Sequence, residues 1–175
     1  MRPLRKVFVL CALVGFVANA RAQGQADFSG SWVIDVDKTA VAAGRAPGTG
    51  RAGAAGAIAI AQDASTLTIT YTNGTKTVYR LDGKEVTHKA TTSASAQGLN
   101  PRMNLPNPGT DEIYKSHWQN SKLVTTMSGH GAHGPTMATE VRWLEGGWMV
   151  VQTTREAQTG NTVQTSYWKK SKKPE

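Results

Sequence analysis

The most conspicuous candidates for chemistry in this sequence are two histidines in one glycine-rich stretch. His130 and His133 lie three residues apart in the phrase G-H-G-A-H-G. Two imidazoles at that spacing could bind a zinc or copper ion if further ligands came from elsewhere in the fold. His88, His117 or Glu140 could supply one, but the sequence does not place them. The favoured interpretation is a hairpin loop with two exposed histidines, and we expect no bound metal.

Arrangements that would indicate an enzyme are missing from the sequence. Asp111 and Glu112 are adjacent, so on a strand their side chains would point to opposite faces. Asp35 and Asp37 share a face but lie where a loop is expected to begin. We therefore expect both carboxylates to be solvated and not held in a cleft, as acid–base catalysis requires. There is no G-x-S-x-G motif, and the single cysteine, Cys11, lies in the N-terminal apolar run. We therefore expect a protein that is not an enzyme and that uses no cofactor.

Aromatic side chains are the better lead to a binding function. The chain has five tryptophans and four tyrosines, spread over its length. Several continue an alternation of apolar residues with threonine, which is typical of a strand with one buried face. Such residues either fill the core or line a cavity for a small ligand. We nominate five of them as ligand-binding residues: Tyr71, Tyr79, Trp118, Trp143 and Tyr167. Tyr71, Trp143 and Tyr167 are the first choices for inward-facing side chains.

The elements that would position these side chains are short antiparallel strands. L-T-I-T-Y-T at 67–72 alternates cleanly and is followed by the hairpin signal Asn73-Gly74, and Asp82-Gly83 marks a second turn. We count about eight to ten strands at the close spacing of an all-β antiparallel meander. Closing such a meander into an up-and-down barrel removes its exposed edges. Segments 40–57, rich in glycine and alanine, and 94–111, rich in proline and asparagine, are expected to be loops.

The N-terminus has the order of a secretory signal peptide. Basic residues in M-R-P-L-R-K precede an apolar run at 7–18, and small residues follow with A-x-A cleavage sites ending at Ala20 or Ala22. We expect residues 1–22 to be removed from a secreted or periplasmic protein whose single β-barrel domain spans 23–170. The mature chain would then contain no cysteine and no disulfide.

The positive charge of the chain lies mostly at its two ends. The net charge is +8, of which residues 1–22 carry four and the segment from Lys169 to Glu175 carries three. The body is therefore close to neutral, which argues against a nucleic-acid-binding groove. The basic tail, residues 171–175, is expected to be solvated. The alternative is that it makes weak contact with an anionic surface of the cell envelope. No transmembrane segment is expected in the mature chain.

A short motif gives the chain a resemblance to a known family. Gly30-Ser31-Trp32 matches the G-x-W of lipocalin and calycin barrels, and F-S-G-S-W-V-I-D-V resembles the first strand of small secreted lipocalin-like proteins from bacteria. That strand would run from Phe28 to Val36. The resemblance implies that Gly30 and Trp32 form a structural motif at one end of the barrel. An arginine usually covers this tryptophan, whereas here the last strand offers Lys169 and Lys170.

Two functions are compatible with these observations. The first is a secreted or periplasmic, non-enzymatic protein that binds a small apolar or amphipathic molecule, such as a lipid, inside the barrel, as the family resemblance implies. The alternative is a structural or protein-interaction module of the cell envelope, with a filled barrel and no ligand. A solvent-accessible cavity inside the barrel would distinguish them, and an interior packed solid would rule out the first function.

Overall fold

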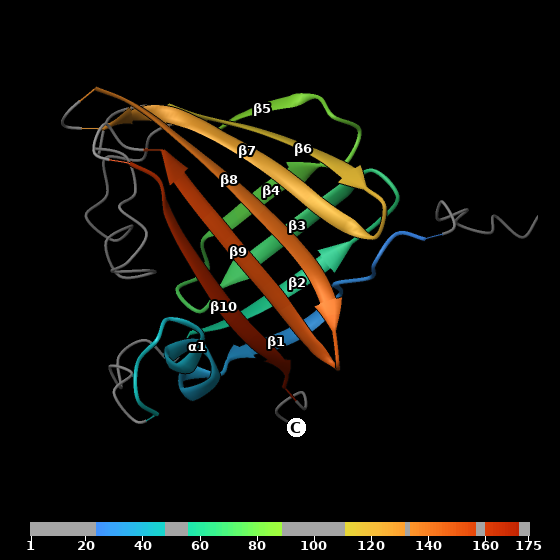
Figure 1. The fold of residues 1–175 in the computed structure, drawn as a ribbon. Coiled ribbons are helices and arrows are strands. Elements are labelled where there is room, and N and C mark those ends of the chain that lie inside the picture. The colour runs from blue at the N-terminus through green and yellow to red at the C-terminus, as the bar shows by residue number, and fades with distance from the viewer. Residues whose placement is uncertain (1–23, 48–55, 89–110, 132–133, 157–159, 172–175) are drawn as a thin grey trace, which may run out of the picture.

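A computed structural model describes residues 24–47, 56–88, 111–131, 134–156 and 160–171. Their strands form one antiparallel sheet that curls into a nearly closed barrel, with a single short helix against its outer side (Figure 1). The elements are β1 (Gly30–Ile34), α1 (Val36–Ala42), β2 (Ala57–Gln62), β3 (Thr66–Tyr71), β4 (Lys76–Arg80), β5 (Glu85–His88), β6 (Glu112–Gln119), β7 (Lys122–Gly131), β8 (Gly134–Glu145), β9 (Trp148–Glu156) and β10 (Thr162–Lys170).

The strand order confirms the predicted meander. The order is β4-β3-β2-β1-β10-β9-β8-β7-β6-β5, so nearly every strand pairs with its neighbours in sequence. The exceptions are β4 and β5, which are consecutive in sequence but lie at the two ends of this order, while β1 pairs with both β2 and the last strand, β10. Two contacts join β4 and the turn after it to the β5–β6 hairpin, where the barrel closes. His88 Nε2 lies 3.0 Å from the carbonyl oxygen of Val78, and Gly83 N donates to Ser116 O at 2.9 Å. The predicted all-β antiparallel meander that closes into a barrel is therefore confirmed.

The first strand is shorter than predicted, because a helix follows it. β1 ends at Ile34, and Asp35 caps α1 by accepting a hydrogen bond from Lys38 N at 2.8 Å. The segment 40–57, predicted as a loop, thus begins with the last helical residues and ends with the first residue of β2. The helix is tied to the barrel at Tyr167, whose backbone N donates to Thr39 Oγ1 at 3.0 Å.

One end of the interior is closed by the segment that precedes β1. Phe28 is fully buried and Trp32 is 1% exposed, and the Trp32 indole donates to the Phe28 carbonyl at 2.7 Å. Gln62 of β2 holds the segment in place, since its amide bonds both Phe28 N at 3.0 Å and Ala26 O at 2.9 Å. The Phe28 ring also stacks parallel to the ring of Trp118, with centroids 6.0 Å apart. These contacts fill this end of the barrel with apolar side chains.

Lys170 covers the buried tryptophan from the last strand. It lies opposite Trp32 in the β1–β10 ladder, and its ammonium is 5.4 Å from the centroid of the indole ring. Gly30 has a φ of +127°, a conformation that other residues rarely adopt. Lys170 therefore lies over the face of the Trp32 ring in a cation–π contact.

Several sequence predictions lie wholly or largely outside the described residues. These are the signal peptide at 1–22, nearly all of the predicted loop 94–111, and the basic tail apart from Ser171. Within the described part of the chain, no helix is long and apolar enough to cross a bilayer.

Removing the Phe28 ring tests the closure of this end. We expect Phe28→Ala to lower the free energy of unfolding by about 3–5 kcal/mol, because it leaves a cavity beside Trp118. Urea denaturation followed by circular dichroism measures the loss. Val163→Ala is the control, since Val163 is 62% exposed and its truncation should change stability by less than about 0.5 kcal/mol. Equal losses in the two variants would contradict the role given to Phe28.

The turn between β2 and β3 should make the free energy of unfolding depend on pH in the acid range. Asp63 accepts hydrogen bonds at 2.7 Å from Thr66 Oγ1, Ser65 N and Thr66 N. These bonds, the one from the Thr66 hydroxyl foremost, hold its pKa well below the ordinary 3.8.

Because the folded state lowers this pKa, the carboxylate stabilises the fold above about pH 4 and loses that effect as the pH falls further. We expect Asp63→Ala to melt below the wild type at pH 7, with the difference shrinking below pH 4. Thermal melts from pH 7 to pH 2 measure it, and a difference that stays constant with pH would refute the assignment.

Candidate functional site

The interior of the barrel contains a buried ion pair on β8. Glu140 and Arg142 are two residues apart, so both side chains project from the same face of the strand. Arg142 Nη2 lies 2.6 Å from Glu140 Oε1, and the two side chains are only 5% and 6% exposed. Charged pairs this deep are rare in cores, because burial removes the hydration of both ions. The pair therefore marks the strongest candidate site in the described part of the chain.

Arg142 has hydrogen-bonding capacity that the described residues leave unused. Its Nε and Nη1 are buried and have no hydrogen-bond partner among the described residues. The Trp118 indole nitrogen is likewise buried without a hydrogen-bond partner among the described residues. A buried donor without an acceptor costs about 1–3 kcal/mol, so such groups need an explanation. Trp118, Leu123 and Arg142 lie on one rung across β6, β7 and β8, which places all three donors at one level of the barrel.

Tyrosines from the facing strands surround this level. The Arg142 guanidinium lies 6.0 Å from the centroid of the Tyr79 ring, and Tyr79 meets Tyr114 edge to face at 5.5 Å. The Tyr114 hydroxyl donates to Glu112. Burial raises the pKa of Tyr79, Tyr71 and Tyr114 above the ordinary value of 10.0. All three phenols stay neutral at physiological pH and keep their O–H groups.

Hydroxyl groups line the next rung. The Ser116 and Thr125 hydroxyls are 2.8 Å apart and buried, and Glu140 lies between Thr125 and Thr153 in the register of β7, β8 and β9. The interior thus contains both apolar and polar side chains. The apolar cluster with Phe28 and Trp32 lies beside the ion pair, the tyrosines and these hydroxyls. A molecule with an apolar part and a polar part would match this combination.

Three of the five nominated residues lie on the inner face. Tyr79 belongs to the core cluster, and Tyr71 and Trp118 pack against it. The structure therefore brings these three side chains together around the rung of Arg142. Whether they contact a ligand stays a prediction.

The expectation that Trp143 and Tyr167 face inward is wrong. Arg142 and Trp168 point to the interior, and their neighbours Trp143 and Tyr167 alternate to the outer face. The Trp143 indole donates to Glu145 at 3.0 Å, with the Lys122 ammonium 4.7 Å from its ring. Threonine and apolar residues occur on both faces of β8, β9 and β10, so alternation alone did not show which face was inside.

Sequence reasoning missed Arg142 and named Glu140 only as a possible metal ligand. A signal was present in A-T-E-V-R-W-L, where Glu140 and Arg142 share a face with Ala138 and Leu144. Opposite charges at i and i+2 on a strand can pair on one face. His130 is exposed near the end of β7, and His133 lies outside the described residues. No three His, Cys, Asp or Glu side chains of the described residues lie close enough to bind a metal ion.

The chain is similar in structure to several solved β-barrel proteins. No protein-family model matches it, and no curated protein resembles it in sequence. The ileal bile acid-binding protein of zebrafish, solved with cholic acid, has a TM-score of 0.49 at 17% identity, covering 82% of this chain and 98% of that one.

Two further structures are similar at the same coverage of this chain. A secretory abundant heat soluble protein of Ramazzottius varieornatus has a TM-score of 0.46 at 14% identity and is covered over 95% of its length. A mutant of the fluorescent protein UnaG has a TM-score of 0.47 at 19% identity and is covered over 96%. These likenesses concern the path of the backbone and do not extend to any ligand.

Separating the ions of the buried pair tests its environment. We expect Arg142→Met to lower the free energy of unfolding by about 3–5 kcal/mol, because it leaves Glu140 charged and buried. The double variant Glu140→Gln/Arg142→Met should lose markedly less, since no unpaired ion remains. Urea denaturation of the wild type, both single variants and the double variant measures the coupling. Strictly additive losses would contradict a direct interaction.

Proposed function

We propose that this protein binds a small amphipathic molecule inside the barrel, without covalent chemistry. The observation that carries the proposal is the set of buried donors without acceptors among the described residues, Arg142 Nε, Arg142 Nη1 and Trp118 Nε1. A ligand whose polar group accepts hydrogen bonds would satisfy them. Its apolar part would lie against the aromatic and aliphatic side chains of the interior, where burial supplies most of the affinity.

A carboxylate is the polar group that fits these donors best. A carboxylate oxygen would accept a charge-assisted hydrogen bond from Arg142 Nε or Nη1, and such bonds are about twice as strong as neutral ones. Arg155 also lies on the inner face of β9, but it pairs with Ala138, whereas Arg142 pairs with Val151. Arg155 is therefore further along the barrel than the donors of Arg142.

The predicted signal peptide is consistent with action outside the cytoplasm. On the basis of the sequence, we propose that the mature protein is secreted or periplasmic and begins at Arg21 or Gln23. The mass of the protein recovered from its own host measures the cleavage position. Retention of residues 1–22 would remove this part of the proposal and would leave ligand binding untouched.

A pair of probes tests the proposed ligand chemistry. We expect a sixteen-carbon carboxylate to bind at least about 10-fold more tightly than the alcohol of the same length, because only the carboxylate forms charge-assisted bonds with Arg142. Isothermal titration measures both affinities, and native mass spectrometry of protein from its own host identifies any ligand that co-purifies.

Two tryptophan variants form a matched comparison. Trp118→Phe keeps the ring that stacks on Phe28 and removes the indole donor, so carboxylate binding should weaken about 5–10-fold. Trp143→Phe makes the same change on the outer face and should leave affinity unaltered. If neither probe binds and nothing co-purifies, the proposal fails and a filled barrel that acts as a structural module becomes the better account.

A further inference from the structure

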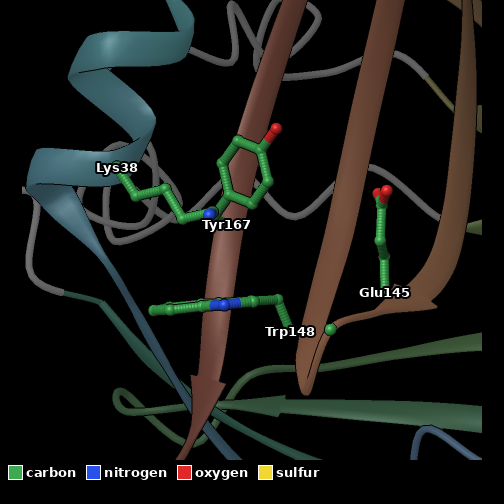
Figure 2. Close-up of a pocket in the computed structure, with 5 residues that line it drawn as sticks. Lys38, Glu145, Trp148 and Tyr167 are labelled. Atoms are coloured by element: carbon green, nitrogen blue, oxygen red, sulfur yellow. The ribbon is translucent and has the colours of Figure 1, made fainter.

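A second site lies on the outer face of the barrel, where α1 approaches β9 and β10. It is a pocket of about 250 Å³, open to solvent and lined by Lys38, Glu145, Gly146, Trp148 and Tyr167. Figure 2 shows Lys38 reaching from the helix toward Tyr167 and Trp148, with Glu145 on the opposite side. Its volume is below the range of about 300–1,000 Å³ usual for sites that enclose drug-sized ligands. It suits a single ring or a short chain of rings.

The walls of this outer pocket are fixed by the barrel and by the helix cap. Glu145 lies opposite Trp148 in the β8–β9 hairpin, and Tyr167 lies on the adjacent strand, β10. On the other wall, α1 is joined to β10 where Asp35 N donates to Tyr167 O at 2.8 Å and Thr39 Oγ1 accepts from Tyr167 N. The aromatic rings and the helix therefore keep their relative positions without a ligand.

Lys38 supplies a hydrogen-bond donor at one side of the pocket. Its ammonium lies 5.0 Å from the Trp148 ring and 4.8 Å from the Tyr167 ring, and these two contacts hold it over the aromatic faces. Among the described residues, no carboxylate forms an ion pair with the Lys38 ammonium, and Asp35, which caps the helix, pairs with Lys169 at 3.8 Å. Its N–H groups therefore stay available to an acceptor in the pocket.

Glu145 supplies an acceptor at the other side. The Trp143 indole donates to its Oε2 at 3.0 Å and so orients the carboxylate, which can still accept from a further donor in the pocket. The pocket thus offers a donor, an acceptor and two aromatic rings in one small, solvent-exposed space. A ligand for it needs an apolar face together with groups that both accept and donate hydrogen bonds.

We propose that this outer pocket binds a saccharide. A sugar ring presents C–H groups that pack on an aromatic ring, and its hydroxyls accept from one neighbour while donating to another. Hydroxyls of one sugar would accept from Lys38 and donate to Glu145. Hydroxyls also remain partly hydrated in an open pocket, so their binding carries a small desolvation cost. The proposal is independent of the ligand proposed for the barrel interior.

Charged small molecules fit the outer pocket less well. A cationic ligand would be repelled by the Lys38 ammonium, which lies 5.0 Å from the Trp148 ring and 4.8 Å from the Tyr167 ring. An anionic ligand would be repelled by Glu145. A zwitterion would rely on ion pairs in a solvent-exposed setting, where such pairs contribute little. The neutral, polyhydroxylated ring is the chemistry that all of the lining residues favour.

Titration with defined sugars tests the proposal. Cellobiose, maltose and chitobiose would be added to the full-length protein, with tryptophan fluorescence and saturation-transfer NMR as readouts. We expect at least one disaccharide to bind with a Kd of about 1 mM, as suits a small open site. Trp148→Ala should abolish binding, and Trp148→Phe should retain part of it because an aromatic face remains.

Two lysine variants form the matched control. Lys38→Met and Lys122→Met each remove an ammonium that covers an outer-face tryptophan, but only Lys38 lines the pocket. We expect saccharide binding to weaken at least about 5-fold in the first and to remain unchanged in the second. Trp118→Phe should also bind sugar normally, which separates this site from the interior one.

Three results would overturn the saccharide assignment. These are no binding of any of the three sugars at 50 mM (about 50 times the expected Kd), undiminished binding by a folded Trp148→Ala protein, or binding of glycine betaine or a dipeptide in preference to every sugar. Circular dichroism of each variant establishes that it is folded.

Discussion

The pairing of β1 with β10 is the constraint on which the rest of the structure depends. β1 has only five residues, yet it joins β2 to the last strand and so converts an open meander into a barrel. The ladder also sets Trp32 opposite Lys170 and brings the segment with Phe28 across the end of the interior. Without this pairing, the sheet would have two more exposed edges and the buried ion pair would face solvent.

Closing the sheet creates two surfaces with different chemistry from one alternating pattern. Inward residues of β8 form the Glu140–Arg142 pair, while the next residue along, Trp143, turns outward and orients Glu145 at the edge of the outer pocket. On β10, Trp168 packs against the core and Tyr167 contacts Lys38 of the helix. Each strand therefore contributes to an interior site and to an exterior one, and a one-residue change of register would exchange them.

The sequence predicted the fold well because the signals for it are local. Alternation at 67–72, the turn at Asn73-Gly74 and the repeated hairpins specify antiparallel neighbours, and the structure has them. The helix Val36–Ala42 was missed because it spans two turns and begins within an apolar phrase that continues the strand pattern. Its stabilising contacts are the Asp35 cap and a bond to Tyr167, a residue 128 positions away from Thr39.

By itself, the sequence determined that strands would follow one another in an antiparallel barrel. It also placed the large side chains of Tyr71, Tyr79 and Trp118 on strands. Only the tertiary structure decided which face of each strand is enclosed. The reason is physical: period-two alternation is symmetric between the two faces, and closure breaks that symmetry through contacts between distant strands. The same closure buries Arg142 with donors that the described residues leave unused, and it sends Trp143 and Tyr167 to the surface.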